Sequence, residues 1–449
     1  MKCIEDEIPF EVPEGWAWSR IFSISQDLPY GTSKKSSSSG EIAVLRMGNL
    51  QQGEIDYTDL VYSSNKEDID KYLLTDGDLL FNRTNSSEWV GKTAIYRGET
   101  AAIYAGYLIR IRSLLDAEYL NSVMNSKYIK EICFLVKTDA INQSNINAAK
   151  LGSFLIPIPP SKEQIRIANK LSDILYWVNY IVTGKLELQQ YIHQIKSKIL
   201  DLAIQGKFVP QDPNDEPASV LLERIRAEKE ELIKQRKIKR DKKESVIFRG
   251  EDNSYYEKVN GEERCINKEI SFSIPDSWIF VRLKHISNII GGGTPKTNIP
   301  AFWNGDIPWL TPADLSEYKE IYISSGKRNI SELGLNSSSA QLLPADSILY
   351  SSRAPIGYIA IASNSVTTNQ GFKSVVPYNT KMSTYLYYCL KARTENIVLR
   401  ATGTTFKEIS GSEMAETIVP LPPIEEQERI SDKIIQLFTE ISEIEKSLN

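Results

Sequence analysis

The apolar positions between residues 161 and 205 follow a helical heptad pattern. From Ile167 onward they recur at alternating steps of four and three, and only Lys185 breaks the series. Such a repeat keeps one stripe of a helix apolar and predicts packing along another helix. We therefore expect one long helix over 161–205. Its stripe consists of Ile167, Leu171, Ile174, Val178, Ile181, Leu188, Ile192, Ile195, Ile199 and Leu202.

Both ends of this helix carry sequence signals. Ser161 and Gln164 match a capping box, in which two side chains bond each other's backbone N–H groups. Gly206, followed by prolines, predicts the end. Gly184 lies inside the helix and costs about 1 kcal/mol relative to alanine, which the apolar stripe must offset. A further helix, beginning with Pro217, is expected over 217–245.

The remaining segments alternate short apolar runs with Gly, Asn, Ser and Pro, which is typical of strands joined by turns. Helical patterns interrupt them at 117–135 and 383–392. This mixture predicts two α+β domains. The expected strands lie within 41–47, 78–84, 93–98, 107–113, 347–353, 357–363 and 372–378.

The chain also contains an internal repeat. Residues 3–21 align with 265–283, with eight of nineteen positions identical. PIPPSKEQIRI at 157–167 and PLPPIEEQERI at 420–430 share seven of eleven positions. A duplicated domain followed each time by a helix predicts an antiparallel coiled-coil pair with pseudo-two-fold symmetry. The heptad stripe after the second copy consists of Ile430, Ile434, Leu437, Ile441, Ile444 and Leu448.

These patterns predict four parts and an α+β fold class. Two homologous domains are separated by helical segments that form the expected pair. The parts are a first domain at 1–160, a central helical region at 161–250, a second domain at 251–423 and a C-terminal helix at 424–449.

Composition adds little that points to a partner. The net charge is −5, which does not by itself suggest nucleic-acid binding. The run 223–243 mixes basic and acidic residues and is interpreted as a solvated helix face. No apolar run reaches the roughly 18 residues that span a membrane, and the N-terminus lacks a basic-then-apolar signal. Four scattered cysteines indicate reduced thiols. We expect a cytoplasmic protein without a membrane segment.

Motifs for catalysis are missing. No G-x-G-x-x-G follows a strand, and two histidines in the whole chain argue against a catalytic triad. The triplet at 91–93 resembles the end of a phosphate-binding loop, but Ser86 replaces its first glycine. GGGTPKT at 291–297 lacks a helix start that could hold a phosphate and is interpreted as a turn. We expect no catalytic residue and no metal site.

Several segments together resemble type I restriction-modification specificity subunits. They are the repeated PPxxEQxRI edges, GGGTPKTNIPAFWNGDIPWLTPADL at 291–315, TTNQGF at 367–372 and AIQGKFVPQDPNDEPASVLLERIRAEKEEL at 203–232. The resemblance covers essentially the whole chain, in the family's order of target-recognition domain, helical region, second target-recognition domain and C-terminal helix. The first domain departs from it, because residues 28–50 lack the GGTP and IPW signatures.

The resemblance implies a subunit without catalysis. Each domain would read one half of a split, asymmetric double-stranded DNA target, and the helices would fix the gap between the halves. The implied partners are two modification subunits, which bring S-adenosylmethionine and methylate adenine N6, and restriction subunits, which use ATP and Mg. The chain itself would hold no cofactor. Two alternatives remain: a self-sufficient DNA methyltransferase or nuclease fragment, and a bipolar protein scaffold that binds no DNA.

Candidate DNA contacts are polar residues in loops, since Arg commonly reads guanine and Asn or Gln reads adenine. Each could instead serve a turn or a surface ion pair. The matched Trp16 and Trp278 are interpreted as core residues, and the heptad residues as the helix-pair interface, some of them also facing a modification subunit. The second-domain candidates are Thr294, Lys296, Ser351, Ser352, Arg353, Gln370, Lys373 and Thr404. Their first-domain counterparts are Arg46, Asn82, Arg83, Asn85 and Lys92.

Overall fold

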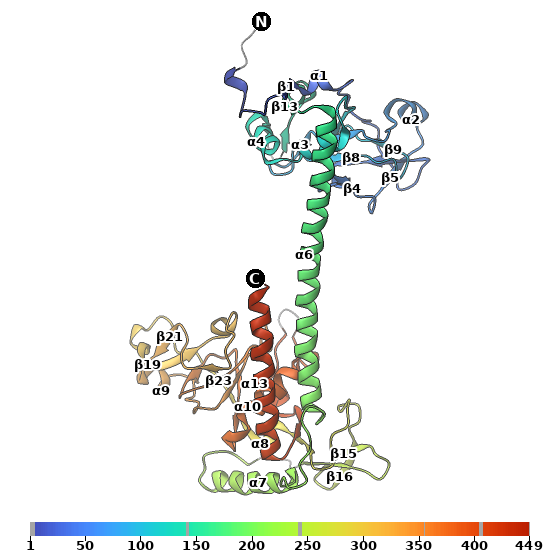
Figure 1. Ribbon diagram of the computed structural model, residues 1–449. Coiled ribbons are helices and arrows are strands. Elements are labelled where there is room, and N and C mark those ends of the chain that lie inside the picture. Colours follow the sequence, from blue (N-terminus) through green and yellow to red (C-terminus); the bar gives the residue numbers. More distant parts are fainter. Residues whose placement is uncertain (1–4, 141–142, 241–244, 354, 404–406, 449) are drawn as a thin grey trace. The chain divides into compact units, whose positions relative to one another are not determined.

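The computed structural model describes residues 5–140, 143–240, 245–353, 355–403 and 407–448. The chain forms two compact units, residues 1–184 and 185–449. Both mix helices and strands, so the expected α+β class is confirmed. Figure 1 labels the elements of each unit. Within the described ranges, no helix is long and apolar enough to span a membrane.

Unit 1 is built on two main sheets that share an apolar cluster, in which Leu45, Leu80, Tyr104 and Leu108 are fully buried. A larger cluster, which includes Phe81 and Leu120, joins the five-stranded sheet to the helices. The five-stranded sheet has the order β10 (Leu108–Ile111), β6 (Leu79–Asn82), β8 (Thr93–Ile95), β4 (Glu54–Ile55) and β3 (Leu50–Gln51). The three-stranded sheet has the order β5 (Val61–Ser63), β2 (Ile42–Leu45) and β9 (Ala102–Tyr104). A small third sheet contains β11 (Thr138–Ala140), β12 (Gln143–Asn145) and β7 (Thr84–Asn85).

Unit 2 repeats this plan. Its three-stranded sheet again places a central strand antiparallel to one neighbour and parallel to the other, as in unit 1. The five-stranded sheet has the order β18 (Ser287–Gly291), β25 (Lys373–Pro377), β22 (Ile348–Tyr350), β23 (Ile359–Ala362) and β20 (Tyr322–Ile323). The three-stranded sheet has the order β21 (Arg328–Ile330), β19 (Trp303–Leu310) and β24 (Thr367–Thr368).

The repeated proline motif closes each unit in the same way. In unit 1, β1 (Ala17–Arg20) pairs antiparallel with β13 (Leu155–Ile158), and in unit 2, β17 (Ile279–Arg282) pairs antiparallel with β26 (Ile418–Leu421). The motif therefore begins in the second strand of each pair, and a helix follows it.

Three side-chain contacts recur in this closure. Gln164 donates to the Pro159 carbonyl and Gln427 to the Pro422 carbonyl, each at 2.9 Å. The hydroxyls of Tyr119 and Tyr385 donate to the Pro157 and Pro420 carbonyls at 2.8 and 2.9 Å. The ion pairs Arg20–Glu7 and Arg282–Glu269 measure 2.6 and 3.1 Å. The motif is repeated because these contacts tie the departing chain to its domain.

The long helix α6 (Ser161–Ile204) agrees with the expected range within one residue. The expected capping box is wrong. Gln164 points into the domain, where its side chain also accepts from the Asp116 N–H at 3.0 Å, and the Pro160 carbonyl bonds the first helical amides. At the other end, Gly206 has a φ of +68°, and the Lys207 N–H bonds the Leu202 carbonyl, as in a glycine-terminated helix.

Two other helix expectations need correction. The helix expected over 217–245 is α7 (Ala218–Lys234). It stops because Arg236 has a positive φ of 58°, and residues 245–249 form the strand β14 instead. The single helix expected over 117–135 is divided into α3 (Ala117–Met124) and α4 (Lys127–Val136), because Ser126 caps the second one. By contrast, α10 (Ser383–Ala392) matches its expected range.

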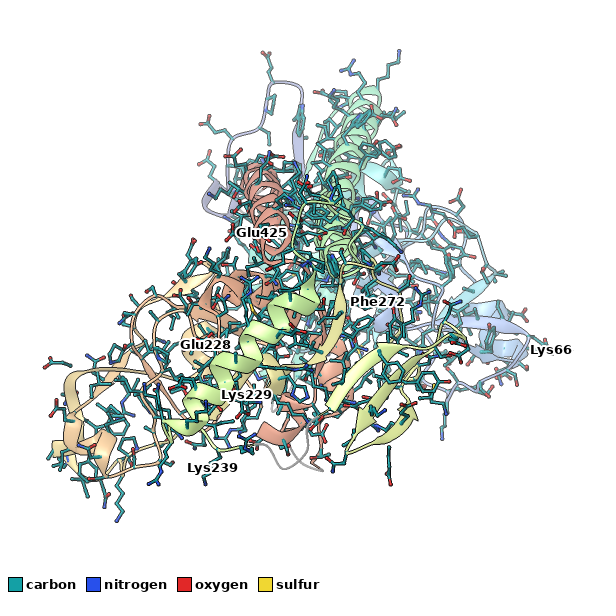
Figure 2. The ribbon with its side chains drawn as sticks, turned by 90° about the horizontal axis from the view of Figure 1, so that it is seen from below. Lys66, Glu228, Lys229, Lys239, Phe272 and Glu425 are labelled. Atoms are coloured by element: carbon teal, nitrogen blue, oxygen red, sulfur yellow. The ribbon has the colours of Figure 1, made fainter. Side chains whose placement is uncertain are left out.

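Because β14 (Ser245–Arg249) pairs with β15 (Tyr255–Val259), the expected domain boundary between residues 250 and 251 cuts through a sheet. The third strand of that sheet is β16 (Glu262–Cys265). Figure 2 shows α7 crossing unit 2, with Glu228 and Lys229 on it. Lys229 donates to the Lys284 carbonyl at 2.9 Å, so part of this charged helix packs against the unit.

The helix α13 (Ile424–Ser447) runs antiparallel to the last part of α6 within unit 2 (Figure 1). Lys196 pairs with Glu445 at 2.7 Å near the C-terminal end of α13. Arg429, near its start, pairs at 2.5 Å with Asp215, which follows α6 in the chain. The antiparallel direction is therefore as expected.

The expected interface is only partly buried. Ile192, Ile199, Ile430 and Ile434 are buried, while Ile167, Leu202, Leu437, Ile441 and Leu448 are half-buried. The structure contradicts the other positions, because every residue from 169 to 191 is exposed. The 24 residues of α13 match only about half the length of the 44-residue α6. The exposed members of the stripe are Leu171, Ile174, Val178, Ile181, Leu188, Ile195 and Ile444.

Candidate nucleic-acid interface

In unit 2, two tryptophans of β19 hold the glycine-rich loop that follows β18. The indole N–H of Trp309 donates to the Gly293 carbonyl at 2.9 Å, and that of Trp303 donates to the Lys296 carbonyl at 3.2 Å. A Cβ on Gly292 would lie 2.0 Å from the Asn369 carbonyl oxygen. The glycine is therefore required because the loop backbone lies directly against the chain that leaves β24.

This anchoring presents three predicted residues at the surface. The exposed Thr294 hydroxyl donates to the exposed Gln370 side-chain carbonyl, which joins the glycine loop to the segment after β24. Lys296 is exposed on the same loop. The fold thus brings together Thr294, Lys296 and Gln370, which lie far apart in the sequence. Hydroxyl, amide and ammonium groups of this kind are those that contact base edges and phosphates.

Other predicted residues of unit 2 are less available. Ser351 and Ser352 are fully buried, and their hydroxyls donate to the Pro355 and Gly371 carbonyls at 2.8 and 3.1 Å. The structure therefore contradicts a role for either in contacting DNA. The half-buried Arg353 forms a backbone bridge to Glu408, whose carboxylate pairs with Lys373 at 3.2 Å. Thr404 lies outside the described residues.

In unit 1, the loop between β6 and β8 gathers three predicted residues. The guanidinium of Arg83 lies 4.5 Å from the centre of the Tyr30 ring. Asn85 is half-buried, and its side-chain oxygen accepts from the Ser86 N–H at 2.8 Å. The ammonium of Lys92 lies 4.2 Å from the exposed Trp89 ring, and burial lowers the pKa of Lys92. These positive groups beside aromatic rings form the cationic part of the unit 1 surface.

Of the two remaining candidate residues in unit 1, one is buried and the other is engaged in an ion pair. Asn82 is fully buried, and its side-chain amide donates to the Trp89 carbonyl at 3.3 Å, so it shapes the loop rather than contacting a ligand. The structure contradicts its assignment as a surface contact. Arg46 is partly exposed but pairs with Asp59 at 2.8 Å, so a phosphate would have to compete with that carboxylate.

Sequence reasoning missed one cation of this surface. Arg328, on β21, is exposed, and its guanidinium lies 3.6 Å from the centre of the Trp303 ring and 5.5 Å from that of Trp309. The signal available was the pair of tryptophans in one short segment, although a β-bulge between Trp303 and Ile307 means that their spacing alone does not place them on one face. No sequence motif marks Arg328. The residue that it faces on β19 is determined by the pairing of the two strands and not by the local sequence.

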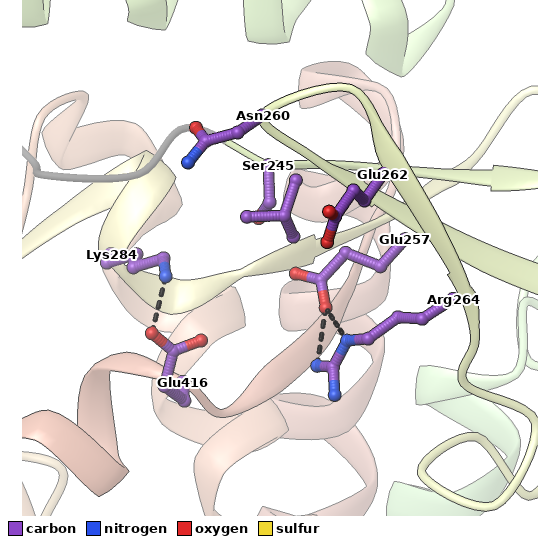
Figure 3. Close-up of a pocket in the computed structure, with 8 residues that line it drawn as sticks. Ser245, Glu257, Asn260, Glu262, Arg264, Lys284 and Glu416 are labelled. Carbon is purple, nitrogen blue, oxygen red and sulfur yellow. Dashed lines mark hydrogen bonds and ion pairs between the residues drawn. The ribbon is translucent and has the colours of Figure 1, made fainter.

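A separate pocket of about 430 Å³ in unit 2 lies between the β15–β16 hairpin and the start of α8 (Leu283–Ile286). Figure 3 shows that two of its carboxylates face cations, with Glu416 bonded to Lys284 and Glu257 bonded to Arg264. Glu257 is buried, which opposes ionisation, but hydrogen bonds from Arg282 and Arg264 lower its pKa to about 2. These pairs are structural, since the carboxylates already have cationic partners.

Among the described residues, no group of three or more His, Cys, Asp or Glu side chains is arranged to hold a metal ion. The candidate surfaces are therefore defined by hydrogen-bonding and cationic groups on loops, in each unit separately.

Each half of the chain matches one family model, the type I restriction modification DNA specificity domain. The matches cover residues 18–189 and 275–449, and the chain therefore belongs to this family. Two relatives come from Methanocaldococcus jannaschii. The MjaIX specificity subunit of a type I restriction enzyme is 44% identical over 178 residues, which are 39% of this chain and 41% of that protein. The MjaX specificity subunit is 25% identical over 435 residues, covering 94% of this chain and 87% of that protein.

Two solved structures share the fold. A chain from a study of complex assembly and conformational transition of the type I R-M system has a TM-score of 0.63 at 17% identity, covering 98% of this chain and 94% of that one. The HsdS subunit from Thermoanaerobacter tengcongensis has a TM-score of 0.54 at 16% identity, covering 98% and 93%. At these identities the likeness concerns the fold alone. The match to MjaIX spans less than half of that relative.

Proposed function

We propose that this chain is the non-catalytic DNA-specificity subunit of a type I restriction-modification complex. One observation carries this proposal: the DNA specificity model matches twice, and each match falls largely within one of two units that share the pairing of their edge strands and of their three-stranded sheets. Each unit has its own set of surface hydrogen-bonding and cationic groups, with different residues in the two. Two DNA-reading surfaces with different residues, built on the same fold, suit a target whose two halves differ in sequence.

In this proposal, each unit reads one half-site, and the helices α6 and α13 set the distance between the half-sites. In dimeric DNA-binding proteins, the distance between the two DNA-binding elements likewise sets the spacing of the half-sites, which lie about 34 Å, or one DNA turn, apart. The partners in this proposal are double-stranded DNA, two modification subunits and restriction subunits, as the family resemblance implies. S-adenosylmethionine, ATP and Mg belong to those partners, and the work takes place in the cytoplasm.

The weak net charge of −5 is compatible with this role if the modification subunits supply many of the phosphate contacts. Phosphate contacts account for most sequence-independent affinity, and base contacts for discrimination. A specificity subunit can therefore select a sequence while its complex provides much of the binding free energy.

A gel-shift and methylation experiment tests the proposal. The purified full chain, its modification subunits, and both together are incubated with duplex DNA and labelled S-adenosylmethionine. We expect methyl transfer only with both present, together with a shifted DNA band. Methyl transfer or cleavage by the chain alone would instead support the fragment enzyme. Unchanged DNA mobility with both present would support the protein scaffold.

A further inference from the structure

We infer that Arg328 reads a guanine in the half-site of unit 2, held in position by Trp303 and Trp309. This inference rests on the proposed function and assigns one determinant of sequence within it. It starts from the distances of 3.6 and 5.5 Å between the guanidinium and the centres of the two rings, which are nearly perpendicular to each other, so that the guanidinium stacks on Trp303 and lies beside Trp309.

The stacking fixes the direction of the guanidinium while leaving its hydrogen-bonding edge open. A guanidinium is planar, so a ring against its face does not occupy the N–H groups in its plane. Those N–H groups form the fork that bonds guanine O6 and N7. Because Arg328 is already ordered, binding would cost little of the side-chain entropy that a free arginine loses.

No carboxylate competes for this fork within the described ranges. Ion pairs engage many other arginines of the protein, such as Arg46 with Asp59 and Arg97 with Glu54. Asp314 lies nearby in the fold, but its carboxylate accepts from the backbone N–H groups of Thr311 and Lys327, at 2.7 and 3.0 Å. Arg328 therefore carries an exposed positive charge that has no ion-pair partner among the residues that the structure describes.

The same tryptophans connect Arg328 to the polar surface already described. Trp303 and Trp309 bond the glycine loop that carries Lys296 and Thr294, and Thr294 bonds Gln370. One scaffold thus carries a guanidinium, an ammonium and an amide. Such a set can combine a phosphate contact with base readout on a single stretch of DNA.

The internal repeat supplies a comparison. In unit 2, Trp309 of β19 is paired with Arg328. At the corresponding place in unit 1, Val44 of β2 is paired with Val61. The cation and its aromatic support are therefore features of one unit on a shared fold. A difference of this kind is expected for a residue that selects sequence and not for one required by the fold.

The test uses the full chain with its modification subunits in a methylation-free host, and methylome sequencing as the readout. Exchange of residues 245–423, which keeps β14 with its sheet, first assigns the half-site that unit 2 reads. In R328K, which keeps the charge but loses the planar fork, we expect discrimination at one guanine-containing base pair of that half-site to fall about 10- to 100-fold. R328Q should do the same, and the other half-site should be unchanged.

R249K is a matched control, because Arg249 is exposed on β14 of the same unit and lies 4.0 Å from Asp276. It should leave the motif intact. Unchanged motifs in R328K and R328Q, or an equal loss of methylation at all sequences, would overturn the inference. Unfolding of both variants in thermal melts would also overturn it, by showing a structural role. Absence of site-specific methylation by the parent chain would refute the proposed function itself.

Discussion

At the residue scale, Arg282 shows how the repeat has been elaborated. Its counterpart Arg20 is partly exposed and pairs with Glu7 at 2.6 Å. Arg282 is buried and contacts the matching Glu269. It also contacts Glu257, in the additional sheet formed by β14, β15 and β16, at 2.6 Å. A buried ion pair is strongly destabilised when one partner is removed, because the other charge is left desolvated. Arg282 is thus one of the contacts that tie this additional sheet of unit 2 to the repeat.

The Glu257 carboxylate makes stability depend on pH. Its pKa in the folded protein is about 2, below its ordinary value of 4.5. The carboxylate therefore stabilises the fold above about pH 4.5, and that contribution is lost as the pH falls toward 2. In Glu257→Gln, we expect a loss of about 3 kcal/mol at pH 7 and a shallower decline in acid.

Thermal unfolding of the full chain between pH 7 and 3 measures both effects. Glu263→Gln is the control, because Glu263 is partly exposed and pairs with the exposed Lys258 at 3.1 Å. It should change stability by less than about 1 kcal/mol. Equal acid slopes for Glu257→Gln and the parent chain would refute the assigned role of this ion pair.

At the element scale, α6 contains two glycines with opposite expected effects. Gly184 is inside the helix, and a Cβ there would meet nothing within 4 Å. Gly184→Ala should therefore stabilise the chain by up to about 1 kcal/mol. Gly206 has a positive φ, and a Cβ there would lie 2.4 Å from Pro275. Gly206→Ala should destabilise the chain by more than about 1 kcal/mol. Urea unfolding of both variants, followed by circular dichroism, tests the pair, and effects of the same sign would contradict it.

The sequence pattern predicted those elements whose signal is local. The long helix and α10 follow from periodicity, and the repeat marked the matched edges without showing that their strands pair. The end of α7 was missed, because its charged sequence continues as a helical pattern past Lys234 while the backbone turns at Arg236. The interface along residues 169–191 was wrong, because a heptad stripe shows what a helix could bury and not what covers it.

The candidate surface was harder to predict than the fold. Ser351 and Ser352 have the polarity of surface residues, yet both are buried, and the hydroxyl of Ser352 is satisfied by the carbonyl of Gly371, which is distant in the sequence. Arg328 was overlooked because its significance comes from Trp303 and Trp309 on the neighbouring strand. Side chains that depend on tertiary pairing carry no signal in the local sequence.

At the scale of the whole molecule, the chain is a duplication with matched edges and unlike surfaces. The edges agree down to single hydrogen bonds, as the glutamines that bond Pro159 and Pro422 show. The surfaces differ in residue type: Arg83, Lys92 and Trp89 in unit 1, and Arg328 with its two tryptophans in unit 2. A shared scaffold with separate readers predicts that specificity can be exchanged one unit at a time.

Replacement of residues 1–160 by the matching domain of another family member, with methylome sequencing of a host that also expresses the modification subunits, tests this account most directly. The account predicts a bipartite methylated motif in which one half changes while the other half and the number of base pairs between them stay as in the parent. A motif that changes in both halves, or one contiguous methylated sequence in the parent, would contradict it.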